Sequence, residues 1–132
     1  MTEESGLRVF ATKWFSRFAR SEGISDERLC EAVTRAEQGS VDADLGGNLI
    51  KQRVARAGGG RSGGYRTLIA YQTARRSVFL YGFAKSERDN IEPKRLAELK
   101  TLARRFVSLT DGEILNLLNA GDMRELDYEG QN

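Results

Sequence analysis

The sequence predicts an α+β fold, in which a small twisted antiparallel sheet of three to four strands carries N-terminal helices on one face, followed by C-terminal helices. Two observations lead to this prediction. Residues 12–39 and 93–121 have the apolar spacing of helices, whereas residues 48–84 hold segments rich in Tyr, Ile, Val, Phe and Leu, as strands do. The resulting order, β-α-α-β-β-β-α-α, is typical of helices packed on one face of an antiparallel sheet.

A short edge strand and a first helix begin the predicted fold. Residues 7–11 are β-prone, and Thr12 resembles the N-cap of a helix that runs to about Glu22. Three aromatic residues fall at helical spacing on the apolar side of this helix, and we expect them to be core residues: Trp14, Phe15 and Phe18.

A second helix is predicted over residues 25–39. Cys30 lies on it with no base beside it in the sequence, which favours an ordinary helix cysteine over a nucleophile. Residues 40–47 are expected to form a loop, in which Asp42 and Asp44 resemble the start of a calcium-binding loop. No glutamate closes that pattern, and we expect no metal there.

Three strands are predicted in the middle of the chain, over residues 48–54, 65–73 and 77–84. Only three residues join the second strand to the third, which predicts a hairpin. Five of the seven residues at 58–64 are glycines, so regular structure is not expected there. This segment lacks the spacing of a P-loop, and no Gly-Lys-Ser/Thr follows it.

Two further helices and a tail complete the prediction. Residues 93–106 begin with proline, which suits a first helical turn, and continue with helical apolar spacing. Thr110 and Glu113 match a capping box that opens a last short helix, and this helix ends near Gly121. The acidic tail from Asp122 is expected to be loosely ordered.

Length and composition narrow the class of protein. The 132 residues suit one domain over 1–132, with a core at about 7–108 and a C-terminal helix and acidic tail at 109–132. We expect no membrane span and no secretory signal, and a single cysteine suits a cytoplasmic setting. There is no histidine, which removes the commonest general base and metal ligand, so no metal or cofactor is expected.

Basic residues are concentrated in the middle of the chain. Residues 48–88 hold nine Lys or Arg and one acidic residue, a net charge of +8. The segments 1–47 and 89–132 each hold six basic and nine acidic residues, a net charge of −3. This distribution predicts a polyanionic partner that docks on the middle of the chain, although a solvated sheet face with scattered charges is the alternative.

Strand alternation brings several of these cations to one surface. Lys51 and Arg53 point the same way, Arg66 lies in the next strand, and Lys85 ends the third. Such a site could cleave RNA through the ribose 2′-hydroxyl, with Lys51 as base, Arg66 on the phosphate, and Lys85 or a tyrosine as acid. A pure binding surface would need the same residues. Contacts to RNA bases and phosphates are predicted for Arg56, Arg61, Tyr65, Tyr81 and Arg88.

Four short segments carry a family resemblance. They are Asp42-Ala43-Asp44-Leu45-Gly46-Gly47, Ile50-Lys51-Gln52-Arg53, Ser62-Gly63-Gly64-Tyr65-Arg66 and Tyr81-Gly82-Phe83-Ala84-Lys85-Ser86. Together they resemble the RelE/ParE superfamily of toxins from type II toxin–antitoxin systems, close to its HigB-like branch. The resemblance runs from about residue 7 to residue 106.

The resemblance implies a ribosome-dependent endoribonuclease that cuts mRNA in the decoding site, and a cognate antitoxin that covers the basic surface. RelE-like catalytic positions correspond to Lys51, Arg53 and Arg66, and Lys85 and Arg88 fall in the family's Gly-Lys-Arg-Glu-Arg stretch. The sequence departs from the pattern at Ser86, where an arginine is expected, and at Ile91-Glu92, where RelE carries a tyrosine. Because of these two departures, the acid–base arrangement of RelE itself does not transfer directly. The histidine of HigB-type toxins is also missing.

Two other functions stay open at this stage. One is a ParE-like toxin that binds DNA gyrase and cuts nothing. The other is a nucleic-acid-binding protein without catalysis. The dense central Lys/Arg set favours the ribonuclease, because gyrase inhibition does not require a phosphate-cleaving site.

Overall fold

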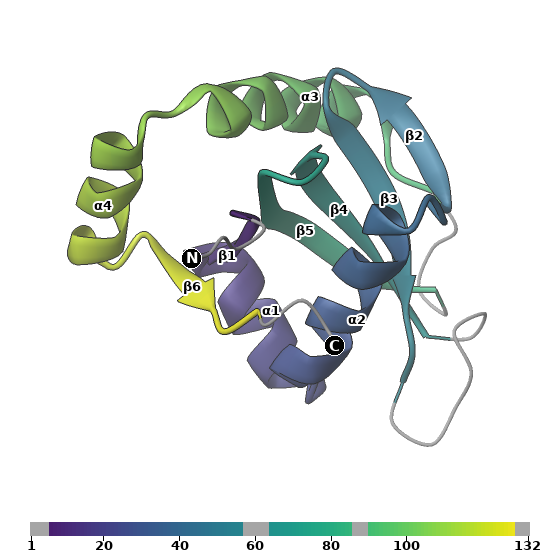
Figure 1. Cartoon of the computed structure of the whole chain (residues 1–132). Helices are drawn as coiled ribbons and strands as arrows, with labels where there is room; N and C mark the ends of the chain where they lie inside the picture. The colour runs from purple at the N-terminus through teal and green to yellow at the C-terminus, as the bar shows by residue number, and fades with distance from the viewer. Residues whose placement is uncertain (1–5, 57–63, 86–89, 129–132) are drawn as a thin grey trace.

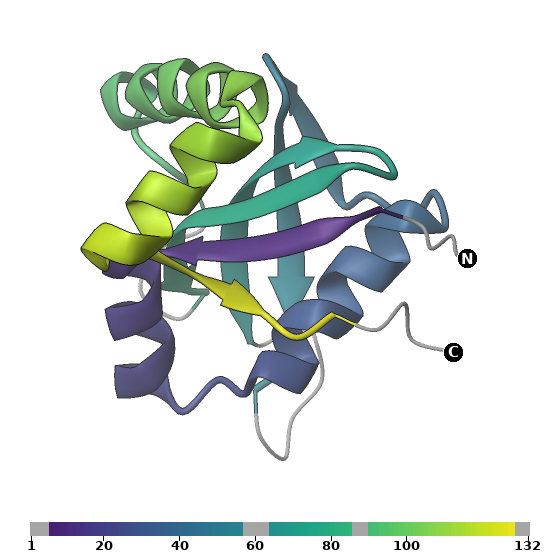
Figure 2. The same cartoon turned by 60° about the vertical axis from the view of Figure 1, so that its left-hand side comes forward.

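In a computed structural model of the protein, which describes residues 6–56, 64–85 and 90–128, a mixed sheet lies between two pairs of helices (Figures 1 and 2). The elements are β1 (Arg8–Thr12), α1 (Lys13–Glu22), α2 (Asp26–Glu37), β2 (Ala43–Gly46), β3 (Leu49–Val54), β4 (Tyr65–Gln72), β5 (Arg76–Ala84), α3 (Pro93–Ser108), α4 (Asp111–Ala120) and β6 (Met123–Leu126). The α+β class is therefore as the sequence predicts.

The sheet differs from the prediction in size and in direction. It has six strands in the order β2-β3-β4-β5-β1-β6, rather than three to four. β1 runs parallel to β5, and the other neighbouring strands are antiparallel. β1 is also not an edge strand, because β6 pairs with it on its other side through Val9–Leu126 to Thr12–Met123.

The two strands that the sequence did not predict are β2 and β6. Each has only four residues, and both contain polar or acidic side chains that suit loops as well as strands. Their extended form comes from pairing with β3 and with β1, which no local pattern reports. The expectation of a loosely ordered tail after Asp122 was therefore wrong for residues 123–126.

Helices cover both faces of the sheet, whereas the sequence predicted helices packed on only one face. α1 and α2 pack on one face with Val9, Ile50, Ile69 and Phe79, and α3 and α4 pack on the other (Figure 2). The core of that second face consists of Phe10, Leu49, Leu68, Ala70, Val78, Leu80, Phe83, Leu99, Ala103, Val107, Ile114 and Met123. The reason lies in the central strands, where neighbouring residues on opposite faces are both apolar, so both faces need cover.

The helix boundaries follow the predicted local signals. The side-chain oxygens of Thr12 and Ser25 accept hydrogen bonds from the backbone of the first turns of α1 and α2. Thr110 and Glu113 form the predicted capping box of α4. Cys30 is buried in α2, and burial raises the pKa of its thiol to about 11, so it is a poor nucleophile. Within the described ranges, no helix is long and apolar enough to cross a membrane.

Candidate functional site

The α3-facing side of the sheet has two ends with different chemistry. At one end, which we call the covered end, the buried residues Leu49, Ala70 and Val78 lie under α3 and α4. The other end lies where β3 and β5 finish and β4 begins. We call it the basic end, and it consists of Lys51, Arg53, Arg66, Tyr81 and Phe83.

Strand register brings the residues of the basic end into two rows. Arg53 lies opposite Arg66, which lies opposite Phe83. Lys51 lies opposite Leu68, which lies opposite Tyr81. Like charges directly across a sheet repel each other, so the Arg53–Arg66 pairing concentrates positive charge on a surface that suits an anion.

Lys51 borders a small hollow at the foot of α3. The hollow has a volume of about 170 Å³ and is lined mainly by apolar side chains, among them Leu45, Leu68 and Phe83. Lys51 is half-buried, and its side chain makes no hydrogen bond or ion pair within residues 6–56, 64–85 and 90–128. A ligand could therefore bind its ammonium group without displacing any residue of these ranges.

Asp42 anchors Arg53 from the neighbouring edge. Its carboxylate accepts hydrogen bonds from the backbone N–H of Arg53 at 2.7 Å and from Arg53 Nη2 at 3.2 Å. Arg35 contacts the same carboxylate at 3.4 Å and donates to the carbonyl of Arg53. Burial alone would raise the pKa of Asp42, but the hydrogen bonds from Arg53 and the charges of Arg53 and Arg35 outweigh it and hold the pKa below its usual range. In this loop, which resembles the start of a calcium-binding loop in sequence, Asp42 thus binds the side chains of Arg35 and Arg53. We call this arrangement the arginine clamp.

Arg66 and Lys85 differ in exposure. Arg66 is buried, with 9% of its surface exposed, whereas Lys85 is exposed just after β5. The backbone N–H of Lys85 donates to the carbonyl of Gly64 at 3.0 Å, which holds the two strand ends together. Lys51, Arg53, Arg66 and Lys85, the four predicted catalytic residues, therefore share one end of the sheet.

The predicted RNA-binding residues divide between the two faces. Tyr65 points to the α1 side, where its ring packs edge-on against Phe18 and its hydroxyl donates to the carbonyl of Glu22. Tyr65 is buried, so a base cannot stack on its ring, and its burial contradicts the prediction that Tyr65 contacts RNA. Arg56 is exposed, with its guanidinium 5.6 Å from the Tyr65 ring centroid. Arg61 and Arg88 lie outside the described residues.

Tyr81 makes the aromatic contacts of the basic end. The ring of Trp14, from the first turn of α1, stacks on it with 4.7 Å between centroids. The guanidinium of Arg95, from the first turn of α3, lies 5.0 Å from the centroid of Tyr81. Sequence reasoning missed Arg95, because only the crossing of α3 over the sheet brings it there.

Trp14 corrects a prediction, since it was expected to be core and is 48% exposed. Its neighbours Phe15 and Phe18 do face the sheet, as predicted. The cause is the early end of β1 at Thr12, which leaves the second half of β5 without a neighbour on that side. The first turn of α1 therefore starts at a sheet edge, and Trp14 reaches around that edge to Tyr81.

The sequence of this chain matches the model of one known protein family. The model of the RelE toxin of the RelE/RelB toxin–antitoxin system matches residues 7–126. The chain belongs to the RelE toxin family. No curated protein matches it, and the family match does not distinguish the HigB-like branch.

As a member of the RelE family, the protein is a toxin of a toxin–antitoxin system, and the family implies an antitoxin partner. The match extends through α4 and β6, which the sequence analysis placed beyond the usual core. In the part of the chain that the structure describes, no group of three or more His, Cys, Asp or Glu side chains could hold a metal ion.

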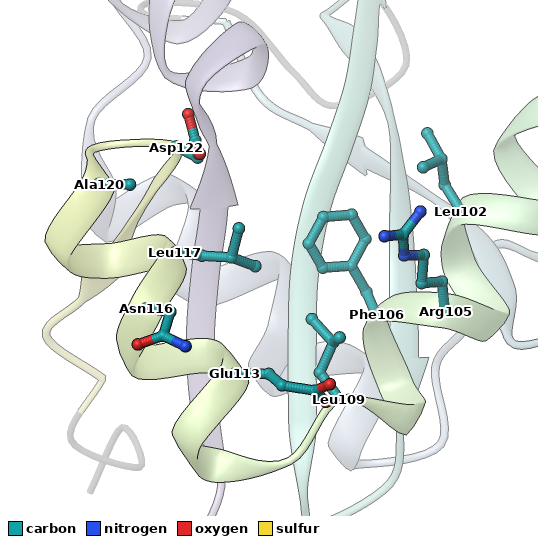
Figure 3. Close-up of a pocket in the computed structure, with 9 residues that line it drawn as sticks. All are labelled: Leu102, Arg105, Phe106, Leu109, Glu113, Asn116, Leu117, Ala120 and Asp122. Carbon is teal, nitrogen blue, oxygen red and sulfur yellow. The ribbon is translucent and has the colours of Figure 1, made fainter.

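The RelE-family chain also has a larger hollow, far from the basic end along α3. This hollow has a volume of about 490 Å³ and separates α3 from α4 (Figure 3). Phe106 and Leu109 line it from the α3 side, Leu117 faces them from α4, and Arg105 and Glu113 lie at its rim. Its lining combines apolar side chains with one cation and two carboxylates, Glu113 and Asp122, so its chemistry does not suit an RNA backbone.

Proposed function

We propose that this RelE-family toxin is a metal-independent endoribonuclease that cuts mRNA on the ribosome at the basic end. The observation that carries the proposal is the convergence of Lys51, Arg53 and Arg66 on adjacent strands, at an end of this sheet face where Lys51 and Arg53 are partly exposed among the described residues. Cations on rigid strands can hold a phosphate in a fixed position, which is what phosphoryl-transfer chemistry requires.

The proposed reaction is an attack of the ribose 2′-oxygen on the adjacent phosphorus. Lys51 accepts the 2′-hydroxyl proton as the new O–P bond forms. Arg66 and Arg53 donate hydrogen bonds to the phosphate oxygens, where negative charge grows in the transition state. The bond from phosphorus to the 5′-oxygen breaks, and Lys85 or the hydroxyl of Tyr81 supplies the proton that this oxygen takes up.

Asp42 has a positioning role in this proposal. One of its hydrogen bonds fixes the backbone N–H of Arg53 and the other fixes Nη2, which leaves the rest of the guanidinium for the phosphate. The first turn of α3 begins close to the basic end, and the positive N-terminal end of its helix dipole adds positive potential there. Arg56, Arg61 and Arg88 would extend the contact to neighbouring phosphates.

The antitoxin is proposed to inhibit by neutralising this surface. An acidic or amphipathic segment that lies over Lys51, Arg53 and Lys85 would occupy the phosphate positions and complement their charge. The same cations thus serve the substrate and the inhibitor in turn.

Cleavage mapping in a purified translation system tests the proposal. Wild type is compared with Lys51→Ala and with Arg105→Ala, a matched cation at the rim of the hollow between α3 and α4. We expect cuts in translated mRNA, about 10²- to 10⁴-fold slower in Lys51→Ala because a positioned general base is lost. Arg105→Ala should cut as wild type does, and free RNA is the control for ribosome dependence.

Absence of cleavage by a folded wild type would overturn the proposal. A DNA gyrase supercoiling assay would then test the ParE-like alternative, in which Lys51→Ala should have little effect. Binding of RNA without any cleavage would leave the third function, that of a nucleic-acid-binding protein.

A further inference from the structure

Trp14 is a large aromatic side chain held in a fixed orientation at the surface. Its ring stacks on Tyr81 at 4.7 Å with 25° between the ring planes, and it lies 5.8 Å from Phe18 with 12° between planes. Even so, 48% of the residue stays exposed. A ring that is already immobilised loses little conformational entropy when a ligand packs on it.

Tyr81 connects Trp14 to the basic end. Trp14 stacks on the Tyr81 ring, and the guanidinium of Arg95 lies over the same ring, 5.0 Å from its centroid. The three side chains come from α1, β5 and α3, so they form a stack around the free edge of β5. We call this Trp14–Tyr81–Arg95 group the edge stack, and its middle ring lies two strands from Lys51 in the same row.

A row of cations continues from the edge stack along α1. Lys13, Arg17 and Arg20 have the i, i+4, i+7 spacing of one helix stripe, and all three are exposed. None of them makes an ion pair with another residue of the described ranges. Residues 1–47 as a whole carry a net negative charge, so the charge distribution along the sequence conceals this stripe.

An exposed aromatic ring beside a row of unpaired cations is the arrangement that binds single-stranded nucleic acid, because bases stack on the ring while phosphates follow the cations. We propose that Trp14 is a base-stacking residue, and that a single strand of RNA runs from the basic end over the edge stack onto the Lys13–Arg17–Arg20 stripe. The inference rests on the proposed function, since it names where the substrate strand lies beyond the cleaved bond. A protein partner would also use an exposed Trp, but the adjoining stripe holds only cations, which favours a polyanion.

The single tryptophan of the chain makes the proposal directly measurable. The probe is a short oligoribonucleotide with 2′-O-methyl groups throughout, which cannot be cut by 2′-oxygen attack. We expect Trp14 emission to change as this probe is titrated into the protein of residues 1–132, because a base then covers the indole. Binding measured independently by anisotropy of a labelled probe should be about 5- to 100-fold weaker for Trp14→Ala.

Matched variants separate stacking from general damage. Trp14→Phe should keep most of the affinity, because a smaller ring still stacks. Leu115→Ala, which removes an exposed apolar side chain on α4, should bind as wild type does. Arg17→Gln should reduce the salt dependence of log K by about 0.7, as loss of one phosphate contact from a single strand does, whereas Arg105→Gln should leave it unchanged.

The outcomes distinguish this proposal from the nuclease proposal. Loss of affinity in Trp14→Ala, with no cleavage by wild type on any RNA, would support the stacking site and overturn the nuclease. Cleavage by wild type with unchanged affinity and unchanged emission at Trp14 would overturn the stacking site alone. An emission change with the purified antitoxin but not with RNA would also overturn it, because the surface would then belong to a protein contact.

Discussion

The covered end and the basic end lie on the same face of the same three strands, yet they differ in chemistry over a distance of two residues. Along β3, Leu49 is fully buried under α3, whereas Lys51 is half-exposed. Along β4, Ala70 is buried among apolar side chains and Arg66 lies among cations. The strands are continuous, so the path of α3 over the sheet decides which end is core and which end can bind a ligand.

The difference predicts a separation of effects. Substitutions at the covered end should lower the free energy of unfolding and leave the cleavage rate per folded molecule unchanged. Substitutions at the basic end, such as Lys51→Ala, should do the reverse. Three further substitutions test this separation.

The largest effect on stability is expected at Arg76, which ties α3 and α4 to the sheet. Its side chain is 5% exposed, and Nη1 donates to the carbonyls of Phe106 and Leu109 at 2.8 Å each. Phe106 lies in the last turn of α3 and Leu109 is its C-cap residue, so neither carbonyl has a hydrogen-bond partner within the helix. Arg76→Met leaves them without this donor and should lower the free energy of unfolding by about 3 kcal/mol, measured by urea denaturation.

Cleavage by Arg76→Met should match wild type when both are assayed at a temperature where they are folded. A stable variant with slow cleavage would contradict the separation, because it would show that the far end of α3 governs the basic end.

Gly82→Ala, unlike Arg76→Met, is expected to change both the stability of the fold and the binding of RNA. Gly82 lies in β5 between Tyr81 and Phe83, and its backbone is in close contact with α1. A methyl group there would lie 2.6 Å from Phe18 Cε2 and 3.1 Å from Phe15 Cε1. Both rings are in the packed layer under α1, so the helix must shift, at a cost of about 2 kcal/mol.

Because the same shift moves Trp14 away from Tyr81, Gly82→Ala should weaken RNA binding as well as stability. Thermal denaturation and the 2′-O-methyl probe measure the two effects. A destabilised variant with wild-type RNA affinity would show that the edge stack is not held by the packing of α1.

The sequence predicts those parts of the fold that local signals specify. Thr12, Ser25 and the Thr110–Glu113 box act within one helical turn, so the helix starts were predicted correctly. β2 and β6 depend on pairing with strands elsewhere in the chain, and no pattern within four residues reports that. The cover of both sheet faces by helices was not predicted, for a related reason. A strand with apolar residues on both sides does not indicate which helix packs on which face.

The candidate site divides in the same way. Strand alternation predicted that Lys51 and Arg53 share a face, and the register adds Arg66 directly opposite Arg53. Alternation could not sort Tyr65 from Tyr81, because that depends on which face each helix covers. Helical spacing likewise predicted an apolar side for α1, but the end of β1 exposes Trp14 on it.

The smallest effect is expected at Asp42, the anchor of Arg53. Asp42→Asn removes one charge from the clamp and should lower the free energy of unfolding by about 1 kcal/mol at pH 7. The pKa of Asp42 is held below its usual range in the folded protein, so its contribution to stability is present above an unfolded value of about pH 3.9 and is lost as the pH falls through the lower folded pKa. The stability difference between wild type and Asp42→Asn should therefore shrink in urea denaturation below pH 4.

Asp26→Asn is the matched control for Asp42→Asn. Asp26 also has a lowered pKa, caused first by its hydrogen bonds from Arg124 at 2.7 and 3.1 Å, but it pairs with β6 and lies outside the basic end. In both variants, the free energy of unfolding should depend less on pH below about pH 4 than in wild type, because each variant lacks a carboxyl group whose pKa is lowered in the folded protein. Only Asp42→Asn should also weaken RNA binding, by a few-fold, since Arg53 is then held less firmly toward the phosphate. Equal RNA affinity in the two variants would show that Asp42 stabilises the fold without positioning Arg53.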